Sequence, residues 1–121
     1  MTKVKIHEFD LGIYPRKIWI AITTENKFDG FKELSDMDDS CDAVIEPAYD
    51  CTNNKGGIFI RFASKKSMTN PIIAHESFHA AMRVFEYIGA KLDFDNQEPL
   101  CYLAEYIVKC CEQVKLNKFE S

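Results

Sequence analysis

The chain has 121 residues, of which 46% are hydrophobic and 28% are charged. This size excludes two domains and predicts a single domain over residues 1–121, with a core that needs no disulfide or structural metal. Fifteen Lys and Arg residues against nineteen Asp and Glu residues give a formal net charge of −4. Because a nucleic-acid-binding surface is basic, we expect no nucleic-acid partner.

The sequence offers no membrane-spanning segment. No window approaches the roughly 18 apolar residues that a membrane span needs, and the first fifteen residues lack the apolar run of a signal peptide. We therefore expect a cytoplasmic protein without a membrane partner. The five cysteines include no CxxC pair, so we expect reduced thiols and neither a disulfide framework nor a zinc knuckle. No pattern in the sequence indicates an oligomeric state.

The first half of the chain alternates in the manner of a β-sheet. Strands are predicted at residues 3–9, 17–23, 43–49 and 57–63. Between the second and third strands, Thr24 can cap a short helix over residues 24–34, in which apolar side chains recur at helical spacing. Gly30 weakens that helix by about 1 kcal/mol relative to alanine.

The second half of the chain repeats with the period of a helix. A long helix is predicted from Asn70, a capping residue followed by a proline, to Gly89, a C-terminal stop. A last helix is predicted from Glu98 to Lys115. The fold class is therefore α+β, with a mainly antiparallel sheet of about four strands followed by two helices.

The long helix contains His75-Glu76-x-x-His79, the H-E-x-x-H pattern. Residues four apart lie on one face of a helix, so the two imidazoles can bind one ion, while Glu76 reaches the open side of that ion. A Zn²⁺ ion with three protein ligands lowers the pKa of a bound water to about 7, and a neighbouring carboxylate can take the proton. We therefore expect Zn²⁺ as the cofactor and Glu76 as the general base. The alternative is that both histidines are structural and bind no metal.

A third protein ligand must lie downstream of His79. Glu86 is about 10 Å further along the same helix, too far to share the ion. Glu98 begins the next helix, where the helix dipole favours a carboxylate, and it is the preferred ligand. Asp93, Asp95 and Glu105 stay open as alternatives.

The motif at His75, Glu76 and His79, followed by Glu98, resembles the gluzincin branch of the zincin metallopeptidases. The size of the chain and residues 71–106 are also similar to the very short zincin-like proteins of bacteriophages and mobile elements in gut Bacteroidetes. The resemblance implies a minimal zincin-like domain in which His75, His79 and Glu98 bind zinc and Glu76 transfers the proton. The glycine and third histidine that mark the metzincin branch are absent.

Two further features of a peptidase site can be sought in the sequence. Tyr102 lies one turn after Glu98 and is the best candidate to stabilise an oxyanion, the alternative being a half-buried amphipathic side chain. A peptide also needs a strand edge to pair with, and residues 57–63 are expected to form it because they precede the motif helix. Arg61 in this strand, with Lys65 and Lys66 after it, could attract an acidic substrate; the alternative is that these are exposed charges that solubilise and protect a strand end.

The sequence therefore predicts a zinc metallopeptidase that hydrolyses a peptide or protein substrate at an open, shallow site. The runner-up is a zinc-binding module that acts in binding or regulation and turns over little or nothing. It is motivated by length, because 121 residues leave no room for the second helical lobe of longer zincin peptidases. Glu76-dependent cleavage of peptides distinguishes the two hypotheses.

Overall fold

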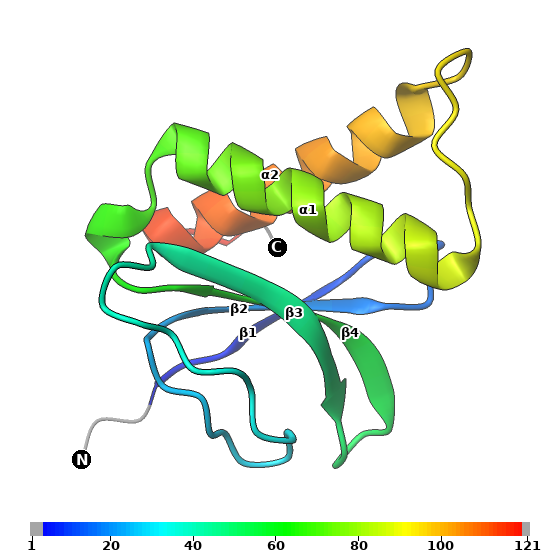
Figure 1. The fold of residues 1–121 in the computed structure, drawn as a ribbon. Helices are drawn as coiled ribbons and strands as arrows, with labels where there is room; N and C mark the ends of the chain where they lie inside the picture. Colours follow the sequence, from blue (N-terminus) through cyan, green and yellow to red (C-terminus); the bar gives the residue numbers. More distant parts are fainter. Residues whose placement is uncertain (1–3, 120–121) are drawn as a thin grey trace.

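A four-stranded sheet precedes two helices in the computed structural model, which describes residues 4–119 (Figure 1). The strands are β1 (His7–Asp10), β2 (Lys17–Ile22), β3 (Ala43–Asp50) and β4 (Lys55–Phe62). A short 3-10 helix, η1 (Lys65–Ser67), leads into α1 (Asn70–Ile88), and α2 (Glu98–Leu116) follows. The predicted α+β fold class is confirmed. No helix within residues 4–119 is both long and apolar enough to cross a membrane.

The strand order in the sheet is β1-β2-β4-β3. The pairs β1–β2 and β3–β4 are antiparallel, as expected of hairpins, whereas β2 and β4 are parallel, so the sheet is mixed. The long connection over residues 23–42 carries the chain to the far edge before β4 returns to the middle. The expectation that residues 57–63 form the edge is therefore wrong, because β4 lies between two strands and β3 is the edge.

Gly57 permits the close parallel pairing of β2 and β4. A Cβ atom at this position would lie 2.1 Å from the main-chain oxygen of Lys17, a separation that no side chain could occupy. Glycine is therefore required where the two strands first meet.

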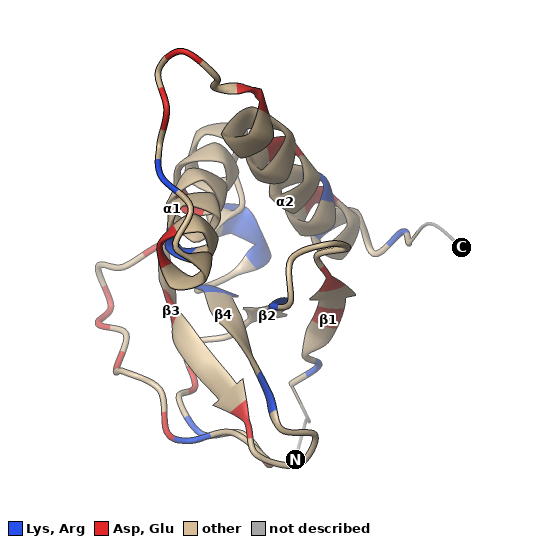
Figure 2. Cartoon of the chain, turned by 90° about the vertical axis from the view of Figure 1, so that its right-hand side faces the viewer, with Lys and Arg blue, Asp and Glu red and all other residues tan. Residues whose placement is uncertain are grey.

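Both helices cover one face of the sheet, as Figures 1 and 2 show from two directions. Alternation along β2 and β4 turns isoleucines and a phenylalanine toward the helices. The buried side chains of this main core include Ile18, Ile20, Ile58, Ile60, Phe62, Ile73, Ala80, Val84, Leu103, Ile107 and Val114. The apolar faces of α1 and α2 are thus used for packing, and the remaining faces of the helices are available for other contacts.

The opposite face of the sheet carries a second, aromatic core. Trp19 and Phe59 point to this side, and Phe28, Phe31 and Leu34 from the long connection pack against them. The ring centroids of Trp19 and Phe31 are 5.0 Å apart, and those of Phe28 and Phe59 are 5.3 Å apart. The helix predicted over residues 24–34 is absent, because this segment turns at Gly30 (φ +86°) and spreads its apolar side chains over the sheet.

The ends of α1 follow simple capping chemistry. The side chain of Thr69, one residue before the predicted cap, accepts a hydrogen bond from the main-chain N–H of Ile72. Asn70 is the first helical residue, and Gly89 ends the helix in the left-handed conformation (φ +77°), as predicted. The helix that carries the motif is therefore fixed at both ends.

Candidate metal site and groove

The two motif histidines lie side by side on the exposed face of α1. The opposite face of the helix is buried against the sheet and α2, which leaves His75 and His79 in solvent. Their Nε2 atoms are 3.2 Å apart, and the two rings meet edge to face at a centroid distance of 4.7 Å. Two Nε2 ligands at 2.0–2.1 Å from a tetrahedral zinc would be separated by about 3.3 Å. The pair therefore has the spacing of two ligands of one ion.

Glu76 is placed beside the histidine pair rather than in line with it. One carboxylate oxygen, Oε1, is 3.9 Å from Nε2 of His75, and the residue is only 8% exposed. Burial raises the pKa of Glu76, and the neighbouring charges of His75 and His79 oppose that effect. A carboxyl group with a raised pKa is better matched to accept a proton near neutrality than a fully solvated one.

A groove runs between the motif helix and the edge strand of the sheet. Its cavity has a volume of about 300 Å³ and is lined by Glu76, His79 and Arg83 from α1 and by residues 43–45 of β3. Arg83 was not singled out from the sequence, although its spacing of four residues from His79 places both on one helix face. The identity of the strand could not be read from the sequence because it depends on the strand order.

Glu98, the preferred third ligand, does not join the histidine pair in this arrangement. Across residues 4–119, no three His, Cys, Asp or Glu side chains are grouped so that they could hold a metal ion. The same holds for the alternatives Asp93, Asp95 and Glu105. Glu98 lies in the exposed first turn of α2, on the helix face away from the core residues Leu103 and Ile107. The three-ligand set stays a prediction.

The start of α2 nevertheless lies close to the motif. Gln97 and Cys101, which flank Glu98 on the helix surface, line an apolar cavity of about 370 Å³ together with Phe78 of α1. Asp93 in the connecting loop lines the same cavity. The face of α2 that carries Gln97 and Cys101 therefore meets the motif helix. Glu98 lies on a neighbouring face of α2, less than one helical turn away.

Tyr102 occupies a different part of the molecule. It lines a cavity of about 570 Å³ with Leu11, Ile13 and Tyr106, on the side where α2 meets the connection from β1 to β2. Its side chain is 65% exposed, and the groove with Glu76 and His79 is not among the cavities that it lines. The structure therefore does not bring Tyr102 together with the motif.

Arg61 is not an exposed charge. Its side chain is fully buried on the aromatic face of the sheet, where it donates hydrogen bonds to the main-chain oxygens of Glu25 and Ser35. It also forms an ion pair with Glu46 at 3.3 Å. The interpretations of Arg61 as a substrate-attracting or solubilising residue are both wrong, because it fixes the long connection to the sheet.

Comparison of this chain with protein-family models, with curated proteins and with solved structures found no match. The function of this chain is therefore inferred from the geometry of its site.

Proposed function

We propose that this chain is a zinc-dependent metallopeptidase in which His75 and His79 bind the metal and Glu76 is the general base. The observation that carries the proposal is the 3.2 Å separation of the two Nε2 atoms, with the Glu76 carboxylate 3.9 Å from one of them. When bound, zinc supplies a Lewis acid that polarises a carbonyl and lowers the pKa of water.

Proton transfer in the proposed reaction would be carried out by Glu76. Glu76 accepts a proton at its carboxylate from the attacking water and returns it to the leaving amine. Its partial burial limits competing hydrogen bonds with solvent. The proposed reaction does not use Tyr102, which lines a separate cavity.

We propose β3 as the strand that holds the substrate. It is the edge strand, and its first three residues line the groove with Glu76 and His79. Pro47 in β3 has no N–H, and prolines are tolerated in sheets where the nitrogen faces away from the partner strand. By the alternation of a strand, the N–H and C=O groups of Ala43 and Ile45 then also face the open edge, where an extended peptide can pair with them.

Glu98 remains the proposed third ligand. A rotation of the first turn of α2 would bring Glu98 to the face now held by Gln97 and Cys101, next to Phe78. That turn has no side-chain cap, and Glu98, Pro99 and Cys101 in it are exposed, while Leu100 packs against the main core. Glu98→Gln should weaken zinc binding at least about tenfold in a competition assay with a chromogenic chelator, whereas the control Glu105→Gln should not. The reverse result would make Glu105 the ligand.

The test of catalysis is Glu76→Gln in the zinc-loaded protein. The substitution should leave zinc stoichiometry near one and abolish cleavage of a broad peptide library, because only the proton acceptor is lost. Equal cleavage by both proteins would refute the mechanism.

A zinc-binding module without turnover is the second candidate. It is favoured by the displaced position of Glu98 and by the small volume of the groove beside the motif, about 300 Å³. In that case zinc binds and the library is not cleaved, but labelled peptides still bind to the groove.

A further inference from the structure

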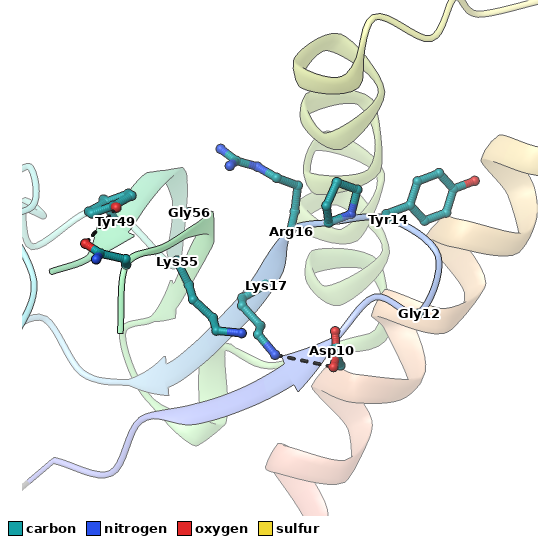
Figure 3. Close-up of a pocket in the computed structure, with 10 residues that line it drawn as sticks. Asp10, Gly12, Tyr14, Arg16, Lys17, Tyr49, Lys55 and Gly56 are labelled. Carbon is teal, nitrogen blue, oxygen red and sulfur yellow. Dashed lines mark hydrogen bonds and ion pairs between the residues drawn. The ribbon is translucent and has the colours of Figure 1, made fainter. Parts of the chain in front are cut away.

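Another cavity lies at the far end of the sheet, where the connection from β1 to β2 meets the turn from β3 to β4 (Figure 3). Its volume is about 440 Å³, and three cationic side chains line it: Arg16, Lys17 and Lys55. Figure 3 shows that Lys17 and Lys55 point one way and Arg16 points the other. The alternation of the strands gives the reason, because Arg16 has the phase of Ile18 and faces the helices.

Arg16 is held in place without a carboxylate. Its guanidinium carbon lies 3.2 Å from the centre of the Tyr87 ring on α1, a cation–π contact. On the other side it lies against Gly56, where a Cβ atom would be only 2.3 Å from Nη1. Within residues 4–119, no acidic side chain forms an ion pair with Arg16, in contrast to Lys17, which is 3.3 Å from Asp10.

A guanidinium fixed in this way is suited to bind a carboxylate. It presents several N–H donors in a planar fork that matches the two oxygens of a carboxylate, and the ring contact reduces the conformational entropy lost on binding. A lysine at the same place would supply a charge without the fork. The ligand class indicated is therefore a carboxylate.

The position of Arg16 relates this cavity to the groove. Arg83 lines the groove with Glu76 and His79, and Tyr87 follows Arg83 by one helical turn. Tyr87 follows Glu76 by eleven positions in α1, which corresponds to a distance of about 16 Å along the helix axis. An extended peptide would span that distance with about five residues. On the other side, β3 runs from the groove residues to Tyr49, which lines the cavity with Arg16.

We propose that Arg16, held by Tyr87, binds the carboxylate of an acidic side chain in a peptide that lies along β3. The acidic residue would sit about five positions from the bond that faces Glu76. This inference rests on the proposed peptidase function and adds a substrate class to it. The sequence suggested that Arg61 attracts an acidic substrate, but the guanidinium of Arg61 is buried. Arg16, whose guanidinium has no carboxylate partner within residues 4–119, takes that role in this proposal.

The test uses zinc-loaded protein carrying Glu76→Gln, so that peptides bind without being cleaved. Fluorescein-labelled dodecapeptides of otherwise constant sequence carry a single glutamate at each position in turn, and each is paired with a peptide that has glutamine instead. Anisotropy should show about tenfold tighter binding of the glutamate peptide at one or two adjacent positions. Adding Arg16→Gln should remove that preference.

Lys55→Gln is the matched control. It removes a positive charge at the same end of the sheet but on its other face, so the glutamate preference should persist. Equal binding of glutamate and glutamine peptides at every position would overturn the inference while leaving the peptidase proposal intact. Retention of the preference in Arg16→Gln, or its loss in Lys55→Gln, would also overturn it. Absence of any peptide binding, together with absence of cleavage by the unmodified protein, would overturn both proposals.

Discussion

The Nε2 atoms of His75 and His79 lie 3.2 Å apart on a helix face that makes no contribution to the core. We therefore expect the two imidazoles to be dispensable for folding. Two imidazoles at this distance can act as a pair of metal ligands. As an exposed hydrogen bond, the same contact would contribute little to the stability of the fold. This separation between site and core makes the metal proposal testable without loss of the fold.

His75→Ala and His79→Ala should each abolish near-stoichiometric zinc binding. The free energy of unfolding of the metal-free protein should change by no more than about 0.5 kcal/mol, because both side chains are exposed. Elemental analysis and urea unfolding measure the two quantities. His7→Ala is the control, since the third histidine of the chain lies on β1 and should not affect zinc content. Zinc retained by either variant would contradict the site.

The long motif helix could be predicted closely from the sequence, because its periodicity, cap and C-terminal glycine are all local signals. The groove could not be predicted in full. Its wall is β3, and that assignment follows from the parallel pairing of β2 with β4, which residues far apart in the sequence decide together. The place of Glu98 likewise depends on how two helices are rotated relative to each other, and no spacing within one helix encodes that rotation.

The helix predicted over residues 24–34 is wrong for a different reason. Phe28, Phe31 and Leu34 have helical spacing, but the same spacing also serves a looping segment that covers the aromatic face of the sheet. Buried Arg61 holds both ends of this segment to the sheet, because it donates hydrogen bonds to the main-chain oxygens of Glu25 and Ser35. A charged residue in an apolar strand was the available signal of a buried polar contact.

Arg61→Met should destabilise the protein by about 2–3 kcal/mol. The substitution leaves two main-chain oxygens and the partly exposed carboxylate of Glu46 without their cationic donor. Arg83→Met removes an exposed ion pair with Glu86 and should cost less than about 0.5 kcal/mol. Urea unfolding compares the two variants, and Arg61→Met should also be cleaved faster by trypsin at Lys27. Equal stability of both variants would contradict the anchoring role.

Four of the five thiols should react in two groups. Burial raises the pKa of Cys111 to about 12, with a hydrogen bond between Cys111 and Ser77 acting in the opposite direction, and Cys110 beside it is also buried. At pH 8 we expect iodoacetamide to label exposed Cys51 and Cys101 rapidly, and to label Cys110 and Cys111 only after denaturation. Mass spectrometry of tryptic peptides gives the extent at each site. Rapid native labelling of Cys111 would mean that α1 and α2 separate readily.

The stability of the fold should depend on pH through His7. Its ring stacks on Phe119 at 5.1 Å, and burial, followed by the charge of Lys5, lowers its pKa from the ordinary value of 6.5. The unfolded chain therefore binds this proton more readily than the folded one. The stabilising contribution of neutral His7 is complete above pH 6.5 and is lost as the pH falls through that value toward the lower folded pKa.

His7→Gln should flatten this dependence in the metal-free protein. Urea midpoints measured between pH 5 and pH 8 should fall less steeply toward acid in the variant than in the unmodified protein. An unchanged slope in the variant would mean that the acid sensitivity arises elsewhere, and that the stacking of His7 on Phe119 does not couple the protonation of His7 to folding.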